Sequence, residues 1–137
     1  MKNLFLVVLL ATATFSFAQK SIPTQVLEAF KKDHKNMDNV KWEKEKGNYE
    51  ASFKINGLEN SMLFDAKGNV LEREVAINKE LLPKGVLDYV AKKYSNQIIK
   101  GTAKINSTKE GLIYEVEIKD KDLLFDKEGK FMREAND

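Results

Sequence analysis

The sequence predicts an α+β protein made of two copies of one unit, each a helix followed by a four-stranded antiparallel sheet. Residues 22–77 and 82–137 carry the two copies, opened 60 positions apart by Ile22-Pro23 and Leu82-Pro83. Later stretches also match: Tyr49–Phe53 with Tyr114–Ile118, and Leu63–Gly68 with Leu124–Gly129. Repetition of a whole helix-and-strand pattern indicates a duplicated structural unit.

A helix is predicted at the start of each copy. Pro23 and Pro83 suit a first helical turn, where the missing N–H costs nothing. Apolar residues then recur at helical spacing and should face the core. They are Val26, Leu27 and Phe30 in the first copy and Val86, Leu87 and Val90 in the second, with His34 and Tyr94 at matching later places.

Strands are predicted after each helix, because apolar and charged residues alternate with a period of two. Asn56-Gly57 is a strong two-residue hairpin signal between two of them. The helices should cover one face of the strands and leave the other face polar and outward. The predicted strands are 40–45, 49–55, 58–65 and 70–77 in the first copy, and 98–107, 112–119, 123–126 and 130–134 in the second.

Residues 1–18 have the pattern of a secretory signal peptide. Lys2 is followed by an apolar run and by Ser16-Phe17-Ala18, with small residues at the positions that precede a cleavage site. A membrane anchor is the rival interpretation, but the apolar run is shorter than the roughly 20 residues that span a bilayer. We therefore expect a periplasmic or secreted protein with no stable membrane anchor, consisting of residues 19–137 as a single domain made of the two repeats.

Composition excludes several classes of function. Without Lys2, 22 basic residues face 21 acidic ones, a net charge of +1, which gives no basic field for nucleic acid. The chain has no cysteine, so thiol catalysis, thiolate metal sites and disulfides are excluded.

No residue pattern predicts catalysis, so we expect no enzyme, no catalytic residue and no cofactor. His34 is the only histidine, and a packing or capping role explains it better than a ligand role. The segments after Asp65 and Asp126 could suggest calcium loops, but lysines occupy positions that need oxygen ligands. Hairpin turns, with Asp bonding the backbone and glycine at positive φ, explain both segments, and no metal is predicted.

Other candidate residues also have simple explanations. Two pairs of glutamates have the spacing of acid/base pairs: Glu72 with Glu74, and Glu115 with Glu117. Exposed strand faces are routinely rich in glutamate, so a solvated face explains both pairs. Trp42 shares its strand parity with Val40, which favours the core over a contact surface.

The residues of the first copy resemble the PepSY-like family of small exported proteins of Gram-negative bacteria, also called β-lactamase-inhibitor-like. The likeness lies in Pro23, Val26 and Phe30, in Val40–Phe53 and in Phe64–Asn69. The second copy has Thr102-Ala103 where a tryptophan would be expected. The resemblance implies an α+β fold with a curved antiparallel sheet and an exported location, and it carries over no inhibitory residue.

The sequence therefore predicts a non-enzymatic binding module that holds a protein or peptide. Inhibition of an enzyme is one form that this binding could take. The alternative is a periplasmic protein that binds a small molecule or metal, between helices and sheet or on the acidic strand face. The predicted binding residues are those expected on the outward face: Glu50, Lys54, Glu72, Glu74, Glu115 and Glu117.

Overall fold

The fold is given by a computed structural model that describes residues 21–136. The predicted signal peptide lies outside the described residues. The chain divides between Arg73 and Glu74 into two compact units, called here the N-terminal unit and the C-terminal unit. Each unit is described by itself.

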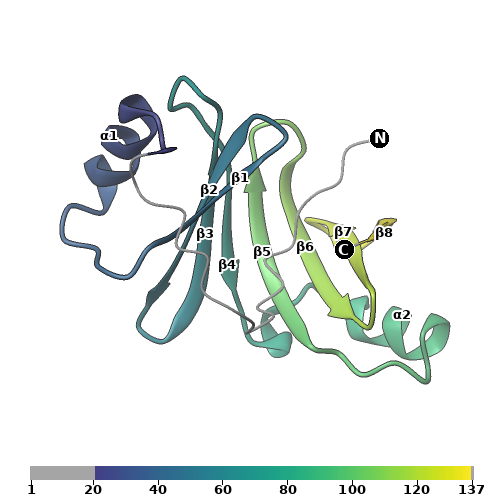
Figure 1. The fold of residues 1–137 in the computed structure, drawn as a ribbon. Coiled ribbons are helices and arrows are strands. Elements are labelled where there is room, and N and C mark those ends of the chain that lie inside the picture. The colour runs from purple at the N-terminus through teal and green to yellow at the C-terminus, as the bar shows by residue number, and fades with distance from the viewer. Residues whose placement is uncertain (1–20, 137) are drawn as a thin grey trace. The chain divides into compact units, whose positions relative to one another are not determined.

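The N-terminal unit is a helix followed by antiparallel strands whose hydrogen-bonded order is the chain order (Figure 1). A single helix, α1, lies against one face of the strands. The elements are α1 (Thr24–Asp33), β1 (Lys41–Glu45), β2 (Asn48–Ile55), β3 (Leu58–Phe64) and β4 (Val70–Ala76), whose last residues belong to the C-terminal unit.

The C-terminal unit repeats this plan and confirms the predicted α+β class, with two helices each followed by four antiparallel strands. Between β4 and α2 lies the short 3-10 helix η2 (Lys79–Leu81). The other elements are α2 (Val86–Lys93), β5 (Gly101–Ser107), β6 (Gly111–Ile118), β7 (Lys121–Asp126) and β8 (Phe131–Asn136).

The helices begin slightly later than their prolines predicted. Pro23 is the N-cap of α1, and its carbonyl accepts the first helical hydrogen bonds from the N–H groups of Val26 and Leu27. In the second copy Gly85, at φ +91°, is the N-cap, so α2 starts three residues after Pro83. The prolines therefore mark the approach to each helix, where their fixed φ suits an extended residue.

Two-residue turns set the register of the hairpins. Lys46-Gly47 and Asn56-Gly57 both have positive φ at each residue, the conformation that matches the twist of antiparallel strands. β2 begins at Asn48, one residue before the predicted start of that strand, so the first of these turns ends earlier than the predicted strands implied. In the C-terminal unit the turn near Asp120 is also earlier than predicted, which places Asp122 inside β7.

The core of the N-terminal unit is largely aromatic. Phe30 of α1 meets Trp42 and Phe53 edge to face, with ring centroids 5.4 and 5.2 Å apart. Trp42 is therefore a core residue, as its parity predicted. Edge-to-face contacts add to the burial energy of such rings. The buried cluster comprises Ile22, Val26, Phe30, Trp42, Tyr49, Ala51, Phe53, Met62 and Phe64.

The core of the C-terminal unit combines aliphatic residues with a different aromatic group. Tyr89 of α2 stacks on Phe131 at 4.9 Å and meets Phe125 edge to face at 5.7 Å. The buried cluster under α2 comprises Val86, Val90, Val116, Ile118, Leu123 and Phe125. Val86 and Val90 face inward as predicted, but Leu87 is only half-buried and lies outside this cluster, and Tyr89 packs against it instead.

The strand registers show which positions are equivalent in the two units. Trp42 pairs with Ala51 across β1 and β2, and Thr102 pairs with Val116 across β5 and β6. Thr102 therefore occupies the position equivalent to that of Trp42, as the sequence predicted. The larger side chain of Val116 partly offsets the smaller side chain of Thr102.

A hairpin glycine touches the start of the helix in each unit. A Cβ on Gly68 would lie 2.6 Å from the carbonyl oxygen of Gln25, and one on Gly129 would lie 2.9 Å from Pro83 Cβ. Both glycines have φ +87°. The backbone approach and the positive φ together require glycine at these two positions.

Candidate functional site

The candidate site is the face of the strands that lies opposite the helix in each unit. The predicted binding residues lie on it by alternation with helix-facing residues. On β2, for example, Glu50 and Lys54 alternate with the buried residues Tyr49, Ala51 and Phe53. The prediction that these residues face outward is wrong for Glu50 and Glu115, which are only 7% and 1% exposed. Glu72, Glu74 and Glu117 are half-buried, and Lys54 is exposed.

Glu50 lies at the centre of an acidic group in the N-terminal unit. Its direct cross-strand neighbours are Glu43 on β1 and Leu63 on β3. Glu45 and Glu72 also act on its carboxylate electrostatically. Among the described residues, Oε1 of Glu50 is buried and has no hydrogen-bond partner.

This environment disfavours the charged form of Glu50. Burial, then the nearby carboxylates of Glu43 and Glu45, raise its pKa from the ordinary 4.5 to about 7, while a hydrogen bond with Ser61 acts in the opposite direction. Burial and like charges both act against ionisation of a carboxyl group. Glu50 therefore changes its charge in the neutral pH range.

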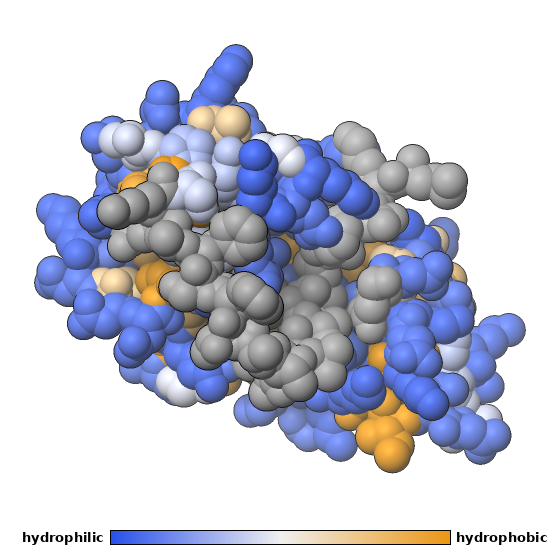
Figure 2. All heavy atoms as spheres, viewed as in Figure 1, coloured by the Kyte–Doolittle hydropathy of each residue, from blue (hydrophilic) through white to orange (hydrophobic). Residues whose placement is uncertain are grey.

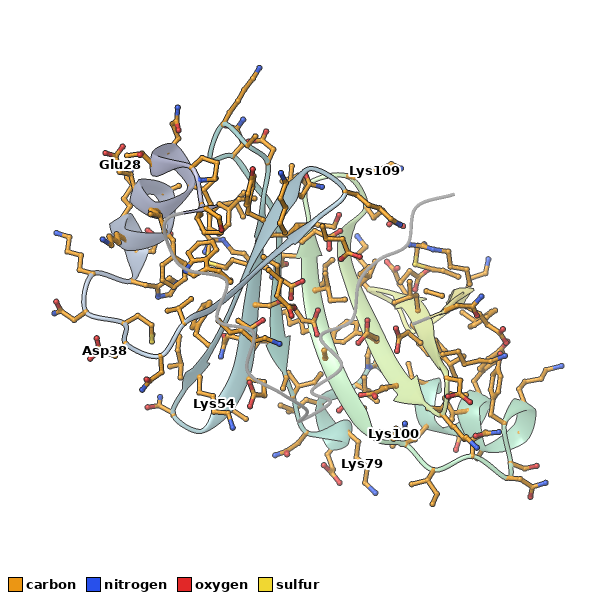
Figure 3. All side chains as sticks on the ribbon, viewed as in Figure 1. Glu28, Asp38, Lys54, Lys79, Lys100 and Lys109 are labelled. Carbon is orange, nitrogen blue, oxygen red and sulfur yellow. The ribbon has the colours of Figure 1, made fainter. Side chains whose placement is uncertain are left out.

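The rim of this face carries lysines in exposed ion pairs. Lys54 Nζ lies 2.7 Å from Glu59 Oε1, and Lys41 Nζ lies 2.9 Å from Glu43 Oε1. Figure 3 shows Lys54 near the end of its strand, beside the β2–β3 turn. Exposed pairs of this kind contribute little to stability and remain available for exchange with a partner's charges.

The corresponding face of the C-terminal unit is partly apolar, which the sequence reasoning missed. Ile105, Ile113 and Leu124 form a buried cluster there, and Ala135 packs against it. A signal was present: Leu123-Leu124-Phe125 is a continuous apolar run, which is typical of a strand covered on both faces.

Glu115 is the counterpart of Glu50 but has different neighbours. Its cross-strand partners are Ala103 and Leu124, where Glu50 has Glu43 and Leu63. The same glutamate therefore lies in an acidic setting in one unit and a more apolar setting in the other.

Two further charged features lie on the face of the C-terminal unit. Glu117 and Asp122 are direct cross-strand partners, and Asp122 is only 1% exposed. Asp122 was predicted in a turn and was therefore not considered as a site residue. Arg133 and Glu110 form a two-pronged ion pair, with N–O distances of 2.7 and 2.8 Å. Such bidentate pairs are the stronger and more directional kind.

A groove of about 620 Å³ lies beside the end of α1 and the segment that follows it. Apolar side chains line it, among them Phe30, Met37 and Trp42, together with the cationic Lys31 and Lys35. This volume falls within the range of small-molecule sites, about 300–1,000 Å³.

The remaining candidates have structural roles. His34 is the C-cap of α1, and its ring contacts Phe30 and Phe53, as a packing and capping role predicted. The hairpin-turn prediction is also confirmed. Asp65 Oδ1 accepts the backbone N–H groups of Lys67 and Asn69 at 2.9 and 3.0 Å.

The equivalent turn in the second copy has the same construction. Asp126 Oδ1 accepts the backbone N–H groups of Glu128 and Lys130 at 3.0 and 2.9 Å. Within the described residues, no group of three or more histidine, aspartate or glutamate side chains is placed to hold a metal ion. No helix in that part of the chain is long and apolar enough to cross a membrane.

The visible described surface is mostly hydrophilic, with hydrophobic residues in small separate patches (Figure 2). The large apolar side chains with the greatest exposure are Ile98 at 82%, between α2 and β5, and Leu81 at 66%, the last residue of η2. Scattered exposed apolar residues are normal and indicate no site by themselves.

Comparison with solved structures finds the same fold in proteins from Bacteroides. A BLIP-like protein of Bacteroides fragilis is 27% identical, with a TM-score of 0.65 over 83% of this chain and 86% of the other. A DUF2874 family protein of Bacteroides uniformis is 24% identical, with a TM-score of 0.71 over 83% and 88%. A "putative periplasmic" protein of Bacteroides eggerthii is 19% identical, with a TM-score of 0.73 over 83% and 88%.

Comparison with curated proteins finds no match. A family model described as "Putative beta-lactamase-inhibitor-like, PepSY-like" matches the chain twice, at residues 10–72 and 56–133. This description is of an inhibitor-like protein and indicates no enzymatic family. Two tandem matches agree with the two units of the structure. The chain therefore belongs to the PepSY-like family.

Proposed function

We propose that this protein is an exported, non-enzymatic binding module that holds a protein or peptide segment on the strand face opposite its helices. The observation that carries this proposal is the composition of that face. In each unit it holds a buried glutamate, Glu50 or Glu115, and further charged residues on the same face. Placing charge away from water costs free energy, and a bound partner with complementary groups would offset that cost.

The relatives support this proposal in two ways. The matched family is described as inhibitor-like, and one similar structure is of a BLIP-like protein, so inhibition of an enzyme is the form of binding that we test first. Another similar structure is described as "putative periplasmic", which supports export. Export itself is tested by mass spectrometry of the processed protein, whose first residue should be Gln19.

The binding proposal is tested by capturing partners with the processed protein and with charge-reversed variants. Reversal is confined to face residues that are not fully buried: Lys54→Glu, Glu72→Lys and Glu117→Lys. These variants should lose the partner that the parent protein captures from the periplasm or medium. Their salt dependence of binding should also change, because face charges act mainly on the association rate.

The control reverses three lysines at the surface of α1 and just after it: Lys31, Lys32 and Lys35. Capture should persist in this variant. If it is lost while the sheet-face variants still bind, the strand face is not the binding surface.

The groove beside α1 favours a second candidate function, binding of a small molecule. Its lining includes Trp42 and Phe30. Lys31 and Lys35 outnumber the one lining carboxylate, Asp38, and would favour a negatively charged group on the ligand. A thermal-shift panel of metabolites with calcium and zinc tests this candidate. A ligand present at 100 times its Kd stabilises by about 2.7 kcal/mol. Met37→Trp, which fills the groove, should abolish any shift that arises there.

A further inference from the structure

We propose that Glu50 recognises a positively charged side chain, lysine or arginine, of the segment bound to the N-terminal unit. This inference rests on the proposed function and specifies the chemistry of the partner. Three observations carry it: an unsatisfied buried oxygen, the carboxylates that surround it, and a neighbouring hydroxyl that orients it.

The buried oxygen comes first. Glu50 is 93% buried, and its Oε1 has no hydrogen-bond partner among the described residues. Buried carboxylate oxygens are normally satisfied by donors, so an unsatisfied one would be stabilised by a donor that a partner supplies. A lysine ammonium or an arginine guanidinium supplies donors and no acceptor.

The surrounding charges select a cation over a neutral donor. Glu43 faces Glu50 directly from β1, and Glu45 and Glu72 act on it from β1 and β4. Lys41 is occupied by an ion pair with Glu43. Like charges on neighbouring strands repel one another, and a cation between them would remove that repulsion.

The hydroxyl of Ser61 on β3 completes the site. It forms a hydrogen bond with the Glu50 carboxylate, which stabilises the charged form and fixes the side chain. Ser61 is itself only 9% exposed, so this contact is shielded from water. The hydrogen bond from Ser61 therefore supports the charged form of Glu50, which is the form that a cation would bind.

The inference predicts that binding depends on pH near neutrality. The pKa of Glu50 is about 7 without a partner, because of burial and the carboxylates of Glu43, Glu45 and Glu72. A bound cation favours the charged form, so Glu50 loses its proton as the peptide binds. The apparent affinity follows the fraction of protein in the charged form and should rise about tenfold between about pH 6 and about pH 8.

The experiment uses the processed protein and three fluorescent octapeptides, capped at both ends, in which valine alternates with lysine, glutamine or glutamate. Fluorescence anisotropy at the two pH values gives each affinity. We expect the lysine peptide to bind most tightly and to show the tenfold rise. Glu50→Gln should remove the rise and weaken binding at the higher pH.

Glu28→Gln is the matched control, because it makes the same change on the outer side of α1 (Figure 3). It should leave both affinity and pH dependence unchanged. Circular dichroism of each variant checks that the fold is retained.

Each contrary outcome has a distinct meaning. If the neutral or acidic peptide binds best, or if Glu50→Gln keeps the pH dependence, the role of Glu50 is overturned, while peptide binding by the face still stands. If none of the three peptides binds, the inference is overturned as well, and the capture experiment alone decides the proposed function.

Discussion

The two units share a backbone plan but differ in how they fill it. In the N-terminal unit Trp42 packs beside Ala51, whereas in the C-terminal unit Thr102 packs beside Val116. Thr102 uses its hydroxyl instead, donating a 2.6 Å hydrogen bond to the carbonyl of Ile77. A duplicated core can therefore change its side chains widely as long as volume and hydrogen bonding are balanced locally.

The ends of the two helices differ in the same way. His34 ends α1 and packs on aromatic rings. Its counterpart Tyr94 donates a hydrogen bond from its hydroxyl to the carboxylate of Glu134. The same carboxylate accepts a 2.9 Å hydrogen bond from Lys121 Nζ. Burial, together with Glu134, raises the pKa of Tyr94 to about 12. The hydrogen bonds from Tyr94 and Lys121 lower the pKa of Glu134. One helix end is therefore fixed by ring contacts and the other by a polar network.

The strand faces differ most, and this difference bears on function. Around Glu50 the neighbouring positions hold Glu43 and Glu45, and around Glu115 the matching positions hold Ala103 and Ile105. The N-terminal unit therefore surrounds its buried glutamate with carboxylates, whereas the C-terminal unit surrounds its own with buried apolar side chains. A duplication allows the two faces to diverge while the cores preserve the fold.

The largest expected effect concerns the positions that the units share. Phe64→Ala and Phe125→Ala should each destabilise the protein by about 3–5 kcal/mol, because both rings are fully buried at equivalent places. Trp42→Ala should cost a similar amount, and Thr102→Ala about 1 kcal/mol, the value of one hydrogen bond. Chemical denaturation measures all four. If neither phenylalanine variant lowers the free energy of unfolding, the prediction of a duplicated core is wrong.

The next effect tests the contact between the hairpin turn and the helix. Gly68→Ala and Gly129→Ala should each cost at least about 1–3 kcal/mol, because positive φ and a close backbone approach both oppose a Cβ. Gly47→Ala is the control, since it keeps a positive φ with open space around the position. Equal losses in all three variants, measured by urea unfolding, would show that φ alone matters.

A smaller effect separates Glu50 from the exposed glutamates. Its pKa in the folded protein, about 7, exceeds the ordinary 4.5, so the folded state holds an extra proton between these values. Its contribution to stability therefore falls as the pH rises through this window. Glu50→Gln should be more stable than the parent by about 1–3 kcal/mol near pH 8, with no difference below about pH 4.5.

The matched control for this prediction is Glu59→Gln, on the same face but in an exposed ion pair with Lys54. Near pH 8, Glu59→Gln should not be more stable than the parent protein to a comparable degree. Melting curves across the pH range give both comparisons, and equal behaviour of the two variants would contradict the buried setting of Glu50.

The smallest effect is expected from the rim of the faces. Lys54→Glu and Glu117→Lys should change the free energy of unfolding by no more than about 0.5 kcal/mol, as is usual for surface substitutions. Denaturant titration measures this change. A larger loss in either variant would mean that the residue supports the fold, and its effect on partner capture could then not be assigned to binding.

The sequence by itself determined the class, the duplication and most of the core under the helices. Local periodicity is enough for these, because Val26, Phe30 and Trp42 face inward by helix and strand spacing alone. The turns at Asp65 and Asp126 followed from the local hydrogen-bonding chemistry of aspartate and glycine. Element ends were less certain, and the early turn at Asp120 moved Asp122 from a loop into a strand.

Only the tertiary structure decided the environment of the candidate site. Alternation placed Glu50 and Glu115 opposite the helices, but it could not show that both are buried or that their neighbours differ. Burial and pKa depend on side chains from strands far apart in the chain, as the effect of Glu72 on Glu50 shows. Periodicity reports which way a residue points, and only the assembled strands determine what it meets there.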